Sequence, residues 1–195
     1  MYKRQPNFFV KQYEYFHYIE LCKVLRKNAI GLKARGVGFS EIAAAILING
    51  YITRPHFRGV VAAQQEGYVD DTLSKCWMQL SYLDDNTEDG MRKLRQVHNT
   101  AKWKRASSKN VDGVESGWMS EIEGITADKP NKIRGDRTDI LMYEESGSWP
   151  NWKKAFIQGD ALIDIQGQRF GIKLAWGTGC LLYTSPSPRD AHESR

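Results

Sequence analysis

Blocks of hydrophobic and polar positions along the chain predict alternating helices and strands. The stretch Phe8–Arg26 carries apolar and aromatic residues at helix-like spacing among Lys and Glu, which predicts a helix with one apolar face: Phe9, Tyr13, Phe16, Tyr18, Ile19, Cys22 and Leu25. The short run Ala29–Leu32 is typical of a buried strand. Glu41–Ile48 is apolar almost all round, which predicts a buried helix that Asn49 and Gly50 end.

The middle of the chain repeats the alternation. Gly59–Ala63 is predicted to be a strand, after a turn that contains Pro55. An amphipathic helix is then expected to end near Asp84–Asn86, on the spacing of Val69, Leu73, Cys76, Trp77, Leu80 and Leu83. A weaker alternation over Met119–Ile125 predicts a further strand. Strands that alternate with helices indicate an α/β layered domain.

The last third predicts a short helix and a hairpin. Trp149–Gln158 is expected to form a loop and a short helix. Two alternating runs on either side of Gly167 predict a hairpin: Ala161, Ile163 and Ile165 before it, and Phe170, Ile172, Leu174 and Trp176 after it.

Composition narrows the class of protein. The chain has 195 residues, 41% hydrophobic and 26% charged, which suits one globular domain with a real core. No apolar run approaches the roughly 20 residues that span a bilayer, and the N-terminus lacks the apolar region of a signal peptide. Cys22, Cys76 and Cys180 have no metal-like spacing, so a reducing compartment is expected. The net charge of +5 permits a nucleic-acid partner without requiring one.

Both ends of the chain differ from the rest. Met1–Gln5 and Leu181–Asp190 resemble translated sequencing-adapter read-through, and the alternative for the second is a disordered Ser/Pro tail. We therefore expect residues 1–5 to be non-native, residues 6–179 to form one domain, and residues 180–195 to be non-native or disordered.

The stretch Gly31–Ser40 joins a predicted strand to a predicted helix through a glycine-rich turn. In this setting backbone N–H groups and a helix N-terminus cradle phosphates. Gly36 and Gly38 allow a tight turn with positive φ, and Ser40 stands where the hydroxyl of a P-loop reaches Mg²⁺. Phe39, however, occupies the lysine position of G-x-x-x-x-G-K-[ST]. The alternative is an ordinary glycine-rich turn.

The segment Asp139–Glu145 has four apolar residues followed by two carboxylates, Glu144 and Glu145. This is the form of a Walker B segment, in which the first carboxylate holds Mg²⁺ and the second orients the attacking water. At the C-terminal end of a parallel strand both would lie beside the glycine-rich loop. Near the end of the chain, Gly177–Gly179 forms a small polar loop after the strand that Trp176 ends, and in isolation it is only a turn.

A basic run extends from Arg92 to Lys109, with His98 and Trp103 interleaved: Arg92, Lys93, Arg95, Lys102, Lys104, Arg105 and Lys109. Such a run can follow a phosphate backbone, so Lys102, Lys104 and Arg105 are candidate DNA contacts. The alternatives are a solvated face or a strand edge that lysines protect.

Together these motifs resemble the ATPase domain of the large terminase subunit, the DNA-packaging motor of tailed bacteriophages. The resemblance covers residues 6–179. Lys33–Ser40 resembles the variant Walker A in which the lysine moves to the front of the loop and an aromatic residue precedes the serine. Ile140–Ser146, preceded by Arg134 and Gly135, resembles the Walker B segment. Ala175–Gly179 resembles the coupling motif, although the family has Gly where Cys180 stands.

The resemblance implies a P-loop NTPase fold of the ASCE type, with three layers around a mainly parallel sheet, truncated after the coupling motif. Its nucleotide loop would be Lys33, Ala34, Arg35, Gly36, Val37, Gly38, Phe39 and Ser40. Lys33 would contact the β- and γ-phosphates of ATP, and Arg35 would be a second contact. Ser40 and Glu144 would hold Mg²⁺, and Glu145 would be the catalytic base. Thr178, with Gly177 and Gly179, would couple hydrolysis to motion.

The resemblance also implies the biological setting. The expected activity is ATP hydrolysis that drives double-stranded DNA into a procapsid, with a portal protein and a small terminase subunit as partners. Complete subunits would form a homo-oligomeric ring in the cytoplasm of the infected bacterium, without a membrane partner. The nuclease domain that follows the coupling motif in the family is absent from this sequence, so no nuclease activity is expected. The alternatives are another helicase-like P-loop ATPase or a non-catalytic DNA-binding fragment.

Overall fold

The computed structural model describes residues 8–34, 36–87, 96–127 and 137–178. The predictions for both chain ends, for Arg35 and Gly179, and for the start of the basic run at Arg92 therefore lie outside the described residues. Among the described residues, no helix is both long enough and apolar enough to cross a bilayer.

A seven-stranded sheet forms the middle layer, in the order β1-β11-β8-β2-β7-β4-β3. The first five strands in this order run parallel, and β4 and β3 extend the sheet in antiparallel fashion. The predicted α/β class with a mainly parallel sheet is confirmed. The strands are β1 (Ala29–Lys33), β2 (Arg58–Ala63), β3 (Gln96–Asn99), β4 (Trp103–Ala106), β7 (Glu121–Thr126), β8 (Ile140–Glu144) and β11 (Ile172–Thr178).

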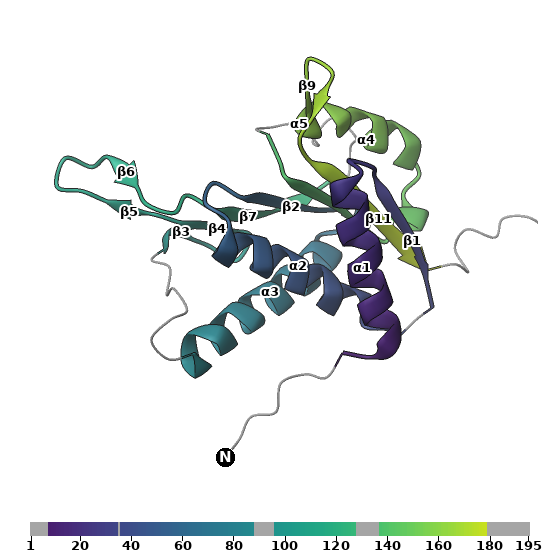
Figure 1. Ribbon diagram of the computed structural model, residues 1–195, viewed down its shortest axis with the longest axis horizontal. Coiled ribbons are helices and arrows are strands. Elements are labelled where there is room, and N and C mark those ends of the chain that lie inside the picture. Colours follow the sequence, from purple (N-terminus) through teal and green to yellow (C-terminus); the bar gives the residue numbers. More distant parts are fainter. Residues whose placement is uncertain (1–7, 35, 88–95, 128–136, 179–195) are drawn as a thin grey trace, which may run out of the picture.

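Helices cover both faces of the sheet, which gives three layers (Figure 1). One side carries α1 (Val10–Val24), α2 (Phe39–Thr53) and α3 (Glu66–Asn86), and the other carries α4 (Trp152–Gln158) and α5 (Asp160–Ile163). Because both faces are covered, β8 and β11 are buried along their whole length. A two-stranded ribbon, β5 (Ser108–Lys109) with β6 (Glu115–Ser116), projects from the sheet beyond β3 and β4.

The prediction of a buried first strand is only partly correct. β1 is the edge of the sheet among the described residues, and the Ile30 and Leu32 side chains are exposed. Tyrosine hydroxyls from α1 satisfy two backbone groups on the open side: Tyr18 accepts from the Ile30 N–H at 3.3 Å, and Tyr15 donates to the Leu32 carbonyl at 3.0 Å. α1 thereby blocks pairing at this edge.

The predicted single apolar face of the first helix is also only partly correct. Ile19 and Cys22 are buried. Four other residues of the predicted face are exposed: Phe9, Tyr13, Tyr18 and Leu25. α1 packs on the sheet at its edge, so fewer of its positions are covered than the spacing indicated.

The prediction that Asn49 and Gly50 end the second helix is wrong, because α2 continues to Thr53. The next residue, Tyr51, is fully buried, and Gly50 packs against the Phe57 ring. A Cβ at Gly50 would lie 2.5 Å from that ring. Tertiary packing therefore explains the glycine, which is not a C-cap.

The predicted hairpin around Gly167 is much shorter than expected. Ala161 and Ile163 belong to α5, and only β9 (Asp164–Ile165) and β10 (Gln168–Arg169) pair around the turn. Ile172–Thr178 leaves the hairpin and enters the main sheet as β11, between β1 and β8. Its apolar side chains are buried on both faces, so alternation gave the wrong partner. The other predicted helices and strands are present.

Phe39, which stands at the usual lysine position of the loop, is a core residue. Its side chain is 2% exposed. The ring centroid lies 4.7 Å from that of Tyr15 and 5.0 Å from that of Trp176. Phe39 thus joins α1, α2 and β11 beneath the glycine-rich loop, and a side chain at this position points away from a ligand.

We expect Phe39→Lys to unfold the domain and not to restore a standard P-loop. The change removes aromatic packing, which costs about 3–5 kcal/mol, and buries a charge in addition. Urea unfolding of the purified chain measures the effect. Val37→Lys, on the exposed part of the same loop, is the control and is expected to change stability by less than about 0.5 kcal/mol. Equal stabilities for the two variants would contradict the role of Phe39.

Candidate nucleotide-binding site

Three neighbouring parallel strands end at the same edge of the sheet and place the candidate site there. β1 ends at Lys33, β11 at Thr178 and β8 at Glu144. Lys33 pairs in register with Thr178 across β1 and β11. The carboxyl edge of a parallel sheet is the usual ligand edge, because loops and helix N-termini converge on it.

The glycine-rich loop has the backbone that its glycines predict. Gly36 and Gly38 have φ of 80° and 68°, and Gly38 is the N-cap of α2. Gln12, buried on α1, donates through Nε2 to the Val37 carbonyl at 3.1 Å. A Cβ on Gly38 would lie 2.6 Å from that nitrogen. α1 therefore supports the loop through a residue whose only sequence signal was a polar side chain on the helix.

Lys33 and Glu145 form the central contact of the site. The Lys33 Nζ lies 2.6 Å from Glu145 Oε1 and 3.8 Å from Glu144 Oε1. Thr178 holds the same Glu145 carboxylate from the other side, through its backbone N–H at 3.1 Å and its hydroxyl at 3.2 Å. One carboxylate is thus fixed between a cation and two neutral donors that come from two different strands.

Glu145 is also in an unusual backbone conformation. It has φ of 47° and ψ of 44°, in the left-handed region, where the chain turns from β8 into the short 3-10 helix η2 (Ser146–Ser148). The Ser148 N–H and hydroxyl both donate to the Glu145 carbonyl, at 2.9 and 2.8 Å. A non-glycine residue in this region costs on the order of 1 kcal/mol or more, and such residues are frequent at functional sites. The turn aims the carboxylate back across the sheet edge.

Gly177 permits the close contact between β11 and η2. A Cβ at this position would lie 2.9 Å from the Gly147 nitrogen. The Ser146 hydroxyl donates to the Trp176 carbonyl at 3.0 Å and fixes the same contact. The predicted motif residue thus has a packing reason in this structure, independent of any coupling role.

Glu144 lies deeper, on the face of the sheet that α2 and α3 cover. It is 4% exposed, with the Ser40 hydroxyl 3.4 Å and the Thr72 hydroxyl 3.5 Å from its carboxylate oxygens. Burial raises the pKa of Glu144 from 4.5 to about 7, although the Lys33 charge lowers it in part. Sequence analysis missed Thr72, whose helix gave no motif.

The neighbouring Glu145 shifts in the opposite direction. Burial raises its pKa, but the Lys33 ammonium and the Thr178 donors outweigh burial, and the pKa lies below its usual value. The site therefore has two adjacent carboxyl groups with different protonation behaviour. Glu145 is ionised at neutral pH, whereas Glu144 takes up and releases a proton near neutrality.

The side chains present fit a magnesium ion. Mg²⁺ prefers hard oxygen ligands and is usually held by one or two protein side chains together with waters and substrate phosphates. The Ser40 hydroxyl and the Glu144 carboxylate form such a pair at the start of α2. A divalent ion would also favour the ionised form of Glu144, whose burial otherwise disfavours it.

The structure thus brings together Lys33, Ser40, Glu144, Glu145 and Thr178 at one edge. Of the other predicted loop residues, Ala34 is exposed, as are Gly36 and Val37, so their backbone groups border open space. The roles of these residues stay predictions.

The candidate DNA-contact residues lie elsewhere, at β4 and the turn before it. Lys102 pairs with Glu66, and the Arg105 guanidinium lies 2.9 Å from the buried Glu121 carboxylate. Lys104 bonds to the Asn99 side chain and lies over the Trp77 ring at 4.9 Å. β4 is an interior strand of the described sheet, so the proposed lysine-protected edge does not apply to it.

Arg105 has a structural role that its place in a basic run does not reveal. Its guanidinium satisfies the buried Glu121 carboxylate, which also accepts from the Trp103 indole at 3.0 Å. Loss of Arg105 would leave that carboxylate short of a donor. Weaker DNA binding by such a variant would therefore not by itself identify a contact.

We expect opposite effects on stability when the two glutamates are replaced by glutamine. The folded-state pKa of Glu144 lies above 4.5, so the folded chain binds more protons than the unfolded chain, and the free energy of unfolding falls as pH rises from 4.5 to 7. Glu144→Gln removes this loss and should be more stable than the wild type at pH 8 by roughly 2–3 kcal/mol, with little difference near pH 5. Glu145, whose pKa is lowered, contributes stability above its usual pKa that is lost as pH falls, so Glu145→Gln should be less stable at pH 8.

Urea unfolding at pH 5 and pH 8, without nucleotide or metal, measures these effects. Glu14→Gln, on the exposed side of α1, is the matched control and should change stability little at either pH. Changes of the same sign for Glu144→Gln and Glu145→Gln at pH 8 would show that the two environments do not differ as described.

Comparisons with known proteins bear on the fold. No protein-family model and no curated protein matches the chain. Three solved structures do: the large terminase ATPase domain of Thermus phage P74-26 (TM-score 0.56, 18% identity, 77% of this chain and 58% of that one), the large terminase of a thermophilic bacteriophage in complex with ADP (0.59, 12%, 88% and 39%), and the HK97 bacteriophage large terminase (0.59, 12%, 90% and 34%).

The chain spans between about a third and three fifths of the length of these structures. At such low identity the likeness concerns the fold. The P-loop NTPase architecture predicted from the sequence is confirmed by it, and the resemblance stated from the motifs is matched by structures of the same kind. The chain has the fold of the ATPase domains of bacteriophage large terminases.

Proposed function

We propose that this chain is the Mg²⁺-dependent ATPase part of a DNA-translocating motor that packages viral double-stranded DNA. The observation that carries the proposal is the convergence of Lys33, Glu145 and Thr178 beside the glycine-rich loop. A structure with the same fold is described as an ADP complex, which supports a nucleotide as the ligand.

In the proposed site the loop and the start of α2 bind the phosphates of ATP. Exposed backbone N–H groups after Lys33 and the α2 N-terminus provide donors and a favourable dipole. The Lys33 ammonium exchanges its contact with Glu145 for the β- and γ-phosphate oxygens. Ser40 and Glu144 would hold Mg²⁺, which supplies charge neutralisation on the phosphate oxygens.

Glu145 acts as the catalytic base in this proposal. Its lowered pKa keeps it ionised at neutral pH, so it accepts a hydrogen bond from the attacking water and orients it. When Lys33 turns to the phosphates, Glu145 keeps its two bonds from Thr178 and hence its position. Thr178 is therefore a positioning residue whose strand, β11, reports the state of the site and fits the proposed coupling role.

The proposed setting follows from the motor family whose fold the chain has. Double-stranded DNA, a portal protein and a small terminase subunit are the proposed partners, and a homo-oligomeric ring in the cytoplasm of an infected bacterium is the proposed assembly. For DNA contact at β4, Lys104 is the best of the three candidates, because Lys102 and Arg105 already pair with carboxylates.

We expect Lys33→Ala to weaken binding of a fluorescent ATP analogue at least about tenfold, because the main phosphate cation is lost. Glu145→Gln should retain binding and lose hydrolysis by at least about a hundredfold, as for removal of a general base. Chelation of Mg²⁺ should abolish hydrolysis in the wild type. Binding is followed by fluorescence anisotropy, and phosphate release is measured at high protein concentration so that neighbouring subunits can associate.

Lys153→Ala, an exposed lysine on α4, is the matched control and should behave as the wild type. Unchanged nucleotide binding in Lys33→Ala, or unchanged hydrolysis in Glu145→Gln, would contradict the assigned roles.

A further inference from the structure

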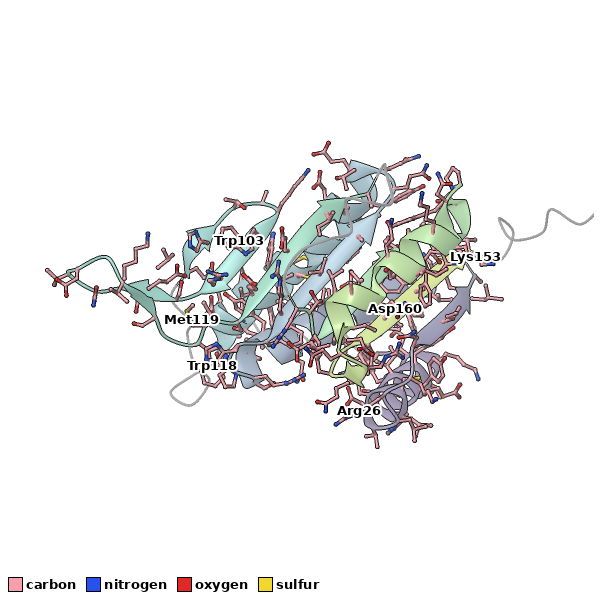
Figure 2. All side chains as sticks on the ribbon, turned by 90° about the horizontal axis from the view of Figure 1, so that it is seen from above. Arg26, Trp103, Trp118, Met119, Lys153 and Asp160 are labelled. Atoms are coloured by element: carbon pink, nitrogen blue, oxygen red, sulfur yellow. The ribbon has the colours of Figure 1, made fainter. Side chains whose placement is uncertain are left out.

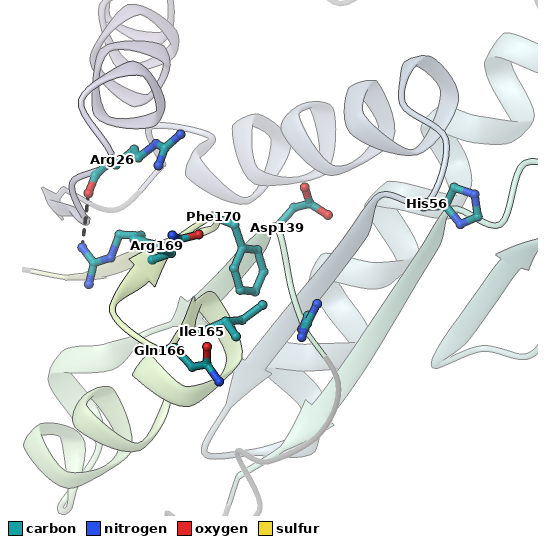
Figure 3. A pocket seen from close by; sticks show the side chains of 9 residues that line it. Arg26, His56, Asp139, Ile165, Gln166, Arg169 and Phe170 are labelled. Atoms are coloured by element: carbon teal, nitrogen blue, oxygen red, sulfur yellow. Dashed lines mark hydrogen bonds between the residues drawn. The ribbon is translucent and has the colours of Figure 1, made fainter.

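A pocket of about 730 Å³ lies at the opposite edge of the sheet, where β8 and β11 begin (Figure 3). Its walls come from the end of α1, the turn between α2 and β2, the residues just before β8, and the β9–β10 hairpin. The chemistry of the lining is set by Arg26, His56, Arg137, Asp139, Arg169 and Phe170. No residue of the candidate nucleotide site takes part in it.

The lining is positively charged. Arg26, Arg137 and Arg169 face a single lining carboxylate, Asp139. That carboxylate is already satisfied, because it accepts from the Arg54 guanidinium at 2.7 Å and from the Arg58 backbone N–H at 2.9 Å. Asp139 therefore does little to neutralise the arginines of the pocket.

Two of the arginines are arranged side by side. Arg169 donates to the Arg26 carbonyl at 3.3 Å, shown as a dashed line in Figure 3, and to Asp160 at 3.3 Å. These bonds restrict the Arg169 side chain before any ligand arrives. Among the described residues, the Arg26 and Arg137 guanidinium groups have no hydrogen-bond or ion-pair partner.

The fold does not require an arginine at position 26. Arg26 has φ of 52° and is the left-handed residue that ends α1, with its N–H bonded to the Lys23 carbonyl and the Lys27 N–H bonded to the Cys22 carbonyl. Glycine is the preferred residue in this motif. An arginine there interacts favourably with the helix dipole, and it also brings a guanidinium to the wall of the pocket.

We propose that this pocket binds a phosphate group. Guanidinium groups bind phosphate through paired charge-assisted hydrogen bonds, and here three converge on one cavity with little opposing charge. The exposed ring of Phe170 offers a stacking surface for a group attached to the phosphate. The phosphate belongs either to the backbone of a nucleic acid or to a free oligophosphate, and the inference is independent of the proposed ATPase activity.

The test uses the whole chain with Lys33→Ala added, so that the nucleotide edge contributes little binding. The probes are a fluorescent DNA duplex of about 20 base pairs, followed by anisotropy, and sodium tripolyphosphate, followed by calorimetry, both at about 50 mM salt. We expect Arg26→Gly to weaken binding about fivefold and Arg26→Gly with Arg137→Gln to weaken it further. The melting temperature of Arg26→Gly should not fall, because glycine suits the backbone.

Lys153→Gln removes the same charge from α4, far from Arg26 in Figure 2, and controls for general electrostatic attraction. A specific loss with DNA alone identifies the nucleic-acid backbone as the source of the phosphate, and a loss with tripolyphosphate identifies a free ligand. If neither probe loses more affinity in Arg137→Gln and Arg26→Gly than in Lys153→Gln, the pocket is not a phosphate site.

Discussion

The ion pair between Lys33 and Glu145 is the contact on which the candidate site depends. It joins the ends of β1 and β8 across β11, and it exists because parallel strands bring their carboxyl ends to one edge. Both side chains are mostly buried, so removing either partner leaves a charge that water cannot fully solvate. In the proposed function, ligand phosphates replace Glu145 as the partner of Lys33, and the carboxylate is released without losing its Thr178 bonds.

The same edge contains features that oppose folding. Glu144 is buried with a raised pKa, and Glu145 is in a left-handed backbone conformation. Neither arrangement is expected in a region selected only for stability. Aromatic packing beneath the edge provides the compensating interactions. On one face Phe39 packs against Tyr15 and Trp176, and on the other a cluster forms from Tyr143, Trp149, Trp152 and Phe156.

Much of this edge could be predicted from the sequence, because its signals are local. A glycine-rich turn between a strand and a helix, and two carboxylates at the end of an apolar run, fix the neighbourhood of Ser40 and Glu144 once the sheet is parallel. The features that were missed depend on packing between distant segments. Gln12 and Thr72 reach the site from helices without motifs, and alternation could not show that β11 inserts between β1 and β8. Phe39 looks like a missing lysine in the sequence, yet its position is a core position, so the cation has to come from β1.

The two candidate sites occupy opposite ends of the same strands. β8 follows Asp139 at the arginine-lined pocket and ends at Glu144 at the nucleotide edge, and β11 connects the neighbourhood of Phe170 to Thr178. Both strands are buried throughout, so they move with the sheet as one body. Coupling between the ends would therefore require an element with two arrangements. In the proposed function the Lys33–Glu145 pair is closed without phosphate and opens when phosphate replaces it, so it is the element at this edge with the chemistry for two such states.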